Sequence, residues 1–154
     1  MAIDLDGIGK SIAAGLCGSV AHSGLMAAKA WAGLLPTFQP YDDLQNLLAS
    51  LVGGTIHPSI LWALSYFNGS VVLAFVFGRI YSILPGRSGA LKGLTFGLLG
   101  WSAMGLVLFP LLGRGFFAAG TDLGLKPSLF SLAMVLTYSV KLGVAYSIFR
   151  PARP

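Results

Sequence analysis

Five side chains that can form hydrogen bonds or carry a proton lie inside long apolar stretches of this chain. We predict that these stretches are membrane helices, where polar groups are costly and therefore mark candidate functional sites. Counted from the outer ends of the helices at about 1.5 Å per residue, four of the side chains reach a similar depth of about 15–18 Å. They are His22, Asn68, Trp101 and Thr137; the fifth, Lys141, lies nine residues before Arg150.

This midplane layer has two interpretations. In the first, the side chains satisfy one another's hydrogen bonds and lock the helices together. In the second, they form a small binding site or a proton-handling position centred on His22, because histidine exchanges protons near neutral pH. Lys141 fits either a long side chain that extends its ammonium group to the cytoplasmic interface or a position on an ion path.

The sequence offers little for catalysis. It has no glutamate, and all of its acidic residues lie outside the apolar stretches: Asp4, Asp6, Asp42, Asp43 and Asp122. No carboxylate pair or metal-ligand cluster is therefore available at membrane depth. Ser23 directly follows His22, so we expect it to point to a different face of the helix and to lack a paired base. We expect neither an enzyme nor a metal site.

No cofactor is expected either. To ligate one haem iron together, His22 and His57 would need to approach within about 4 Å of each other. His57 precedes Pro58 at the outer mouth of a predicted helix, and His22 lies about 18 Å deeper. Cys17 is the only cysteine, and the sequence has no c-type haem or dinucleotide motif. A quinone or a singly ligated haem near His22 is retained as a weaker alternative.

Four predicted membrane helices position these residues. Residues 58–78 and 93–113 each run for 21 residues without a charged side chain, and a bilayer core about 30 Å thick needs about 20 such residues. Hydrophobic residues make up 55% of the 154-residue chain and charged residues 10%, unlike a soluble domain. The predicted fold class is all-α, a single polytopic membrane domain with helices over about residues 10–34, 58–82, 89–113 and 127–149.

A short amphipathic helix is predicted between the first two spans. Apolar residues recur there at helical spacing, at Leu44, Leu47, Leu48, Leu51 and Val52. Asp42 and Asp43 suit the start of a helix, and Gly53 with Gly54 suits its end. We expect a surface helix over about residues 41–52 on the outer face, acting either as a lid packed on the bundle or as a docking surface for a partner.

The basic residues predict the orientation. With four spans, both termini and the loop between the second and third helices share one side, and that side has more basic residues, which favours the cytoplasm. The two sets are Lys10, Arg79, Arg87, Lys92, Arg150 and Arg153 against Lys29, Arg114 and Lys126. Tyr41 and Trp62 fit anchoring at the outer interface. Because the basic residues lie at helix ends and not in one patch, the net charge of +5 does not indicate nucleic acid binding.

Small residues repeat every four positions on two of the predicted helices. The first carries Ser11, Gly15, Ser19, Ser23 and Ala27, and the third carries Gly89, Gly93, Gly97 and Gly105. Such stripes let helix backbones approach closely in lipid. We expect the first and third helices to form the inner pair, touching each other or the other two helices. A glycine-lined pore has no further support.

The two halves of the chain resemble each other weakly. His57-Pro58-Ser59 and Lys126-Pro127-Ser128 open two helices at an offset of 69 residues, and Gly15-Leu16 matches Gly93-Leu94 at an offset of 78. A true duplication would relate the two helical hairpins by a two-fold axis along the membrane normal.

The second and third helices resemble a known group. Phe67-Asn68-Gly69, Leu91-Lys92-Gly93 and Phe109-Pro110-Leu111 followed by Gly113 are similar to the YagU-like group of small bacterial inner-membrane proteins. The resemblance covers about residues 60–115; the first helix and the amphipathic loop do not match. The resemblance implies a location in a bacterial inner membrane, and it indicates no catalytic residue.

The leading functional hypothesis is a non-catalytic accessory or scaffold subunit that associates with other membrane helices, either a partner protein or further copies of this chain in the lipid bilayer. The alternative is a small proton-coupled transporter or carrier that uses the midplane polar residues. The weaker alternative is a quinone- or haem-holding subunit of a redox complex.

Overall fold

A computed structural model describes residues 5–35 and 40–149, which form helices and contain no strand. The first span is α1 (Leu5–Trp31) and the last is α7 (Lys126–Phe149). The second consists of α3 (Pro58–Phe67), the π-helical turn η1 (Asn68–Leu73) and α4 (Ala74–Ile80), and the third of α5 (Gly89–Ala103), the π-helical turn η2 (Met104–Leu108) and α6 (Phe109–Leu111). All four are long and apolar enough to cross a bilayer. The chain is a multi-pass membrane protein.

The helix ends differ from the predicted bounds by a few residues. Within the described residues α1 begins at Leu5 and already ends at Trp31, where Gly33 adopts a left-handed conformation (φ 61°) that closes the last turn. The second and third spans end at Ile80 and Leu111. The N-terminus of α3 is capped by His57, which precedes Pro58 and accepts a hydrogen bond from the Ser59 amide.

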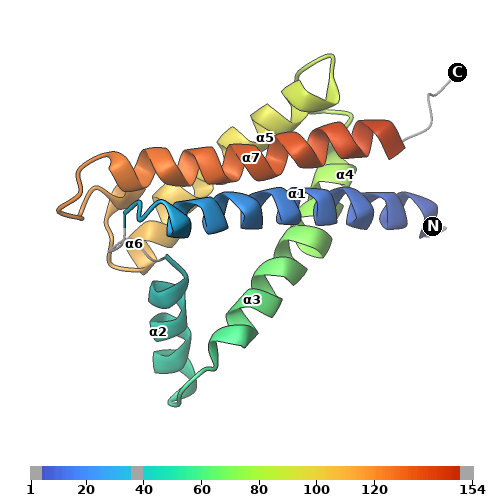
Figure 1. The fold of residues 1–154 in the computed structure, drawn as a ribbon. Coiled ribbons are helices and arrows are strands. Elements are labelled where there is room, and N and C mark those ends of the chain that lie inside the picture. Colours follow the sequence, from blue (N-terminus) through green and yellow to red (C-terminus); the bar gives the residue numbers. More distant parts are fainter. Residues whose placement is uncertain (1–4, 36–39, 150–154) are drawn as a thin grey trace, which may run out of the picture.

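The short helix between the first two spans is α2 (Pro40–Val52). Figure 1 shows α2 and α3 diverging from the α1–α7 pair and meeting at the loop that joins them. The contacts of α2 involve mainly its first turns, whereas Leu51 and Val52 at its other end are exposed. It therefore does not pack on the bundle along its whole length, as a simple lid would.

The central helix is α7, which packs along both α1 and α5 (Figure 1). Its inward face, with Tyr138, Leu142 and Tyr146, forms a core with Ala14 of α1 and Phe77 of α4. Among the described residues, α1 and α5 are not an extensively packed pair. Of the two expected arrangements, the first and third spans touch the other two helices and not chiefly each other, and α7 is the partner that they share.

The glycine stripes are used inside the bundle. Gly93 lies directly against the Ser139 carbonyl of α7, and Gly89 and Gly97 also lie against α7. Gly15 of α1 lies against Ser70 and Ala74 of the second span. Gly105 is different, because it lies against the ring of Phe117 in η3 (Phe116–Ala118), a short 3₁₀ turn in the loop before α7.

The packing gives a duplication no support. A two-fold relation between the hairpins would match the α1–α7 contact with a similar contact between the third span and the second. No such extensive contact occurs among the described residues, although the rings of Phe77 and Phe96 touch, with centroids 5.2 Å apart.

The close approach of α5 to α7 predicts a selective effect of added methyl groups. Gly93→Ala places a Cβ on the Ser139 carbonyl and should destabilise the protein by about 1–3 kcal/mol. In the control Gly100→Ala, on the same helix, the new Cβ meets Val135 at an ordinary 4.0 Å. Thermal unfolding in detergent should show a lower midpoint for Gly93→Ala alone; equal midpoints would contradict this packing.

Candidate functional site

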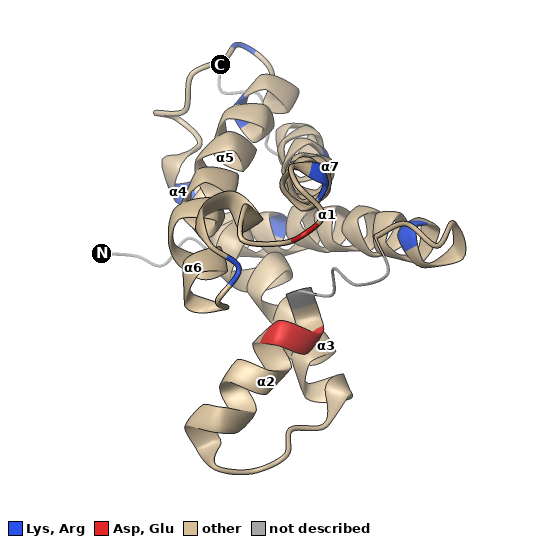
Figure 2. Ribbon diagram, turned by 90° about the vertical axis from the view of Figure 1, so that its left-hand side faces the viewer, with Lys and Arg blue, Asp and Glu red and all other residues tan. Residues whose placement is uncertain are grey.

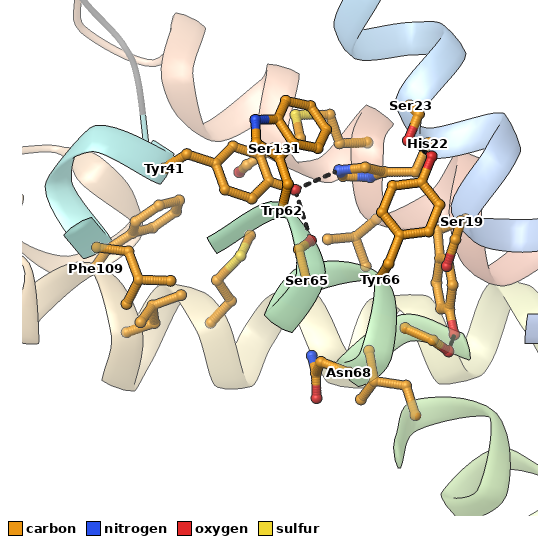
Figure 3. A pocket seen from close by; sticks show the side chains of 18 of the residues that line it. Ser19, His22, Ser23, Tyr41, Trp62, Ser65, Tyr66, Asn68, Phe109 and Ser131 are labelled. Carbon is orange, nitrogen blue, oxygen red and sulfur yellow. Dashed lines mark hydrogen bonds between the residues drawn. The ribbon is translucent and has the colours of Figure 1, made fainter. Parts of the chain in front are cut away.

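A pocket of about 270 Å³ lies where the second span diverges from the bundle. Its wall is formed by α1, α2, α3, η1, η2, α6 and α7 (Figure 3). Most of the surface is apolar, including Trp62, Met104, Phe109 and Met134. Pockets of this kind, apolar with a few placed polar groups, are the usual form of small-molecule sites.

A chain of hydrogen bonds crosses one side of this pocket. The Nε2 atom of His22 lies 3.3 Å from the Tyr41 hydroxyl, which lies 2.9 Å from the Ser65 hydroxyl (Figure 3). The chain therefore links α1, α2 and α3 through groups that exchange protons. The Tyr41 ring also stacks on Trp62, with centroids 5.3 Å apart. Burial raises the pKa of Tyr41 above its ordinary value, so its phenol stays neutral.

A second tyrosine lies beside this chain. The Tyr66 hydroxyl is 2.6 Å from the Ser23 hydroxyl, so α1 and α3 are joined twice. Ser23 and His22 both line the pocket. Each side chain bonds a different tyrosine, as expected of adjacent residues that point to different faces of a helix, although the pocket is wide enough for both to line it.

The deep end of the pocket is built around the two π-helical turns. The Tyr138 hydroxyl of α7 donates a 2.5 Å hydrogen bond to the Gly69 carbonyl in η1, and the Ser19 and Ser70 hydroxyls lie 3.2 Å apart. Met104 and Leu108 of η2 line the opposite wall. Single π-helical turns often mark functional sites, because the extra residue changes which side chains face inward.

The structure brings together only part of the predicted midplane layer. His22 and Asn68 both line the pocket. Trp101 lies one hydrogen bond away, because its Nε1 donates to Ser131, which lines the pocket, at 3.1 Å. Thr137 and Lys141 lie on α7 outside the pocket lining, and Lys141 is exposed.

The pocket lining contains no charged side chain among the described residues. The described residues also contain no group of three or more His, Cys, Asp or Glu side chains that could hold a metal ion. A pocket of hydroxyls, one imidazole and apolar walls suits a neutral molecule, because a charged one would lose its hydration there without a counter-charge.

Comparison with protein families gives a match over nearly the whole chain. Residues 5–154 match the model of a family of unknown function (DUF6789). The chain belongs to this family. No curated protein and no solved structure matches it.

In this DUF6789 protein, an ion pair holds α2 beside the C-terminal end of the third span. Arg114 donates to both carboxylate oxygens of Asp43, at 2.6 and 2.9 Å, and the hydrogen bond to Asp43 raises the pKa of Arg114. Figure 2 shows the acidic start of α2 in red. Gln45 adds a 2.6 Å hydrogen bond to the Ile56 carbonyl in the loop after α2. The pair keeps Tyr41 at the pocket.

Several pocket residues were not predicted to be site residues. Tyr41 and Trp62 were interpreted as interfacial anchors, yet they stack on each other over the pocket. Ser65, Tyr66 and Tyr138 were not singled out, although each carries a hydroxyl inside a predicted span. The sequence did contain an indication that Ser65 is a site residue, because Ser65 lies three residues before Asn68 and therefore near the same face of the helix.

The Asp43–Arg114 pair predicts a small but specific coupling. Both side chains are partly exposed, at 17% and 30%, and such pairs contribute about 0.2–1 kcal/mol. Asp43→Ala and Arg114→Ala should each lower the stability slightly, and the double variant should lose less than the two losses combined. Chemical unfolding of the four proteins in detergent measures this coupling. Strictly additive losses would show that the pair does not hold α2.

Proposed function

We propose that this DUF6789 protein is a non-catalytic membrane protein whose pocket binds a small uncharged amphiphile, as the binding step of a small carrier. The observation that carries the proposal is the uncharged, mainly apolar pocket crossed by the His22–Tyr41–Ser65 chain. Apolar walls suit the body of such a ligand, and a hydroxyl or imidazole at one side suits its polar end.

A non-catalytic role fits the chemistry of the lining. Acid–base and nucleophilic catalysis generally use a base that a further polar group orients. His22 meets a tyrosine that stays neutral, and no carboxylate or thiol is among the lining residues that the structure describes. The site is thus equipped to form hydrogen bonds and to pass a proton between neutral groups.

The accessory-subunit hypothesis has less support than the ligand-binding one. It depended on glycine faces being available for association with other helices. Gly89, Gly93 and Gly97 are covered by α7, and Gly15 by the second span. Association with another helix would have to use other faces of the bundle.

A quinone head group belongs to the proposed ligand class. It is flat and uncharged, and its carbonyl oxygens accept hydrogen bonds, whereas the tyrosine and serine hydroxyls beside Trp62 can donate them. A short-chain benzoquinone is therefore a suitable first probe. A haem is less suitable, because Nε2, one of the two ring nitrogens of His22 that can bind iron, already faces Tyr41.

Ligand binding should depend on the free volume of the pocket. Val135→Trp fills the pocket from α7, whereas the control Leu132→Trp, three residues earlier on the same helix, lies outside the lining. We expect the wild type and the control to retain a small apolar molecule in native mass spectrometry and to be stabilised by the benzoquinone probe. Val135→Trp should do neither. Retention and stabilisation that are identical in all three proteins would rule out the pocket as the binding site.

We also propose that the protein lies in a bacterial inner membrane with both termini in the cytoplasm. The support is the resemblance of residues 60–115 to the YagU-like group and the larger number of basic residues on the side of the termini. The Asp43–Arg114 pair then lies on the outer side.

This orientation predicts the behaviour of reporter fusions. A green fluorescent protein fused after Pro154 should fluoresce, and alkaline phosphatase at the same place should be inactive. Alkaline phosphatase inserted after Gly54, in the loop between α2 and α3, should be active. The reverse pattern would place the termini outside.

A further inference from the structure

A stripe of exposed side chains runs along the second span. Four apolar residues and one polar residue recur every four positions on α3, η1 and α4, and we call them the second-span stripe: Ile60, Leu64, Asn68, Val72 and Val76. The four apolar side chains need no partner other than lipid. The polar side chain of Asn68, at the centre of the stripe, needs a hydrogen-bond partner.

The Asn68 amide lacks a hydrogen-bond partner among the described residues, and its side chain is exposed. It lies ten residues after Pro58, about 15 Å along the helix and hence near the middle of the span. Figure 3 shows the amide turned away from His22, Tyr41 and Ser65. Lipid tails cannot bond an amide, so a polar group at this depth needs a partner from protein.

We infer that this partner is Asn68 of a second copy of the chain, in a two-fold dimer formed along the second-span stripe. A carboxamide both donates and accepts hydrogen bonds, so two of them can satisfy each other reciprocally. Two copies inserted with the same topology place Asn68 at the same depth, as a symmetric interface requires. Asparagine is one of the residues that join membrane helices in this way.

The dimer also covers one side of the pocket. Asn68 lines the pocket, so a second copy seated on the stripe closes the wall at that point. The inference itself does not depend on the proposed function, because it stands on the exposed amide and the stripe that surrounds it.

Disulfide cross-linking in native membranes tests the interface directly. In a Cys17→Ala background, which removes the native cysteine and keeps Asn68, Val72→Cys, four residues further along the second-span stripe, should form a covalent dimer on mild oxidation. The control Leu99→Cys, an exposed position on α5, should not. Cross-linking of Val72→Cys to a different protein, or no cross-link beyond that of Leu99→Cys, would overturn the dimer.

A second measurement isolates the role of the amide. Single-molecule photobleaching in liposomes should show dimers for the wild type and about tenfold weaker dimerisation for Asn68→Leu. Asn68→Gln keeps the amide group and should recover most of the association. The position is exposed, so neither change disturbs the fold of the single chain. Equal dimerisation of Asn68→Leu and the wild type would show that the amide does not join the copies.

Discussion

Hydrocarbon offers no hydrogen-bond partner, and the arrangement of polar groups in this protein follows from that constraint. Inside the bundle, hydroxyls and the indole nitrogen find partners on neighbouring helices: Ser19 with Ser70, Ser23 with Tyr66, and Trp101 with Ser131. Each of these hydrogen bonds joins two spans, so it fixes the orientation of the helices and also meets the hydrogen-bonding need of the polar atoms. The apolar contacts of α7 then fill the space between these fixed points.

The π-helical turns show how the same constraint opens a pocket. In η1 the Gly69 carbonyl receives the Tyr138 hydroxyl from α7, which meets the need of a backbone group at a turn where the α-helical ladder is altered. On the N-terminal side of this turn, α3 diverges from the α1–α7 pair (Figure 1). Space opens between α3 and the other spans, and Tyr41 of α2 reaches into it.

Hydropathy alone predicts the four spans and the short helix, because bilayer thickness and amphipathic spacing act locally along the chain. The glycine stripes correctly indicate close packing, but the partner of each stripe depends on tertiary geometry. The α7 surface that receives the α5 glycines is itself made of small residues four positions apart that were not singled out from the sequence, Ser139, Gly143 and Ser147. Counting residues from the helix ends correctly predicts that His22 and Asn68 line the same pocket. The count gives the depth of a residue but not the side of the helix on which it lies, so it does not separate these two residues from Thr137 and Lys141, which lie outside the pocket. The π-helical turns leave no pattern in the hydropathy at all, and Tyr41 enters the site only because α2 folds back beside α3.

The strength with which α2 is held bears on how a ligand could reach the pocket. The Asp43–Arg114 pair is partly exposed and contributes about 1 kcal/mol or less, and each hydrogen bond of Tyr41 adds about 0.5–1.5 kcal/mol. Together with the Tyr41–Trp62 stack, these contacts hold α2 by only a few kcal/mol. A ligand that takes over the hydrogen bonds of Tyr41 replaces part of what holds α2 closed. Tyr41 is therefore the side chain through which a ligand bound in the pocket would act on α2.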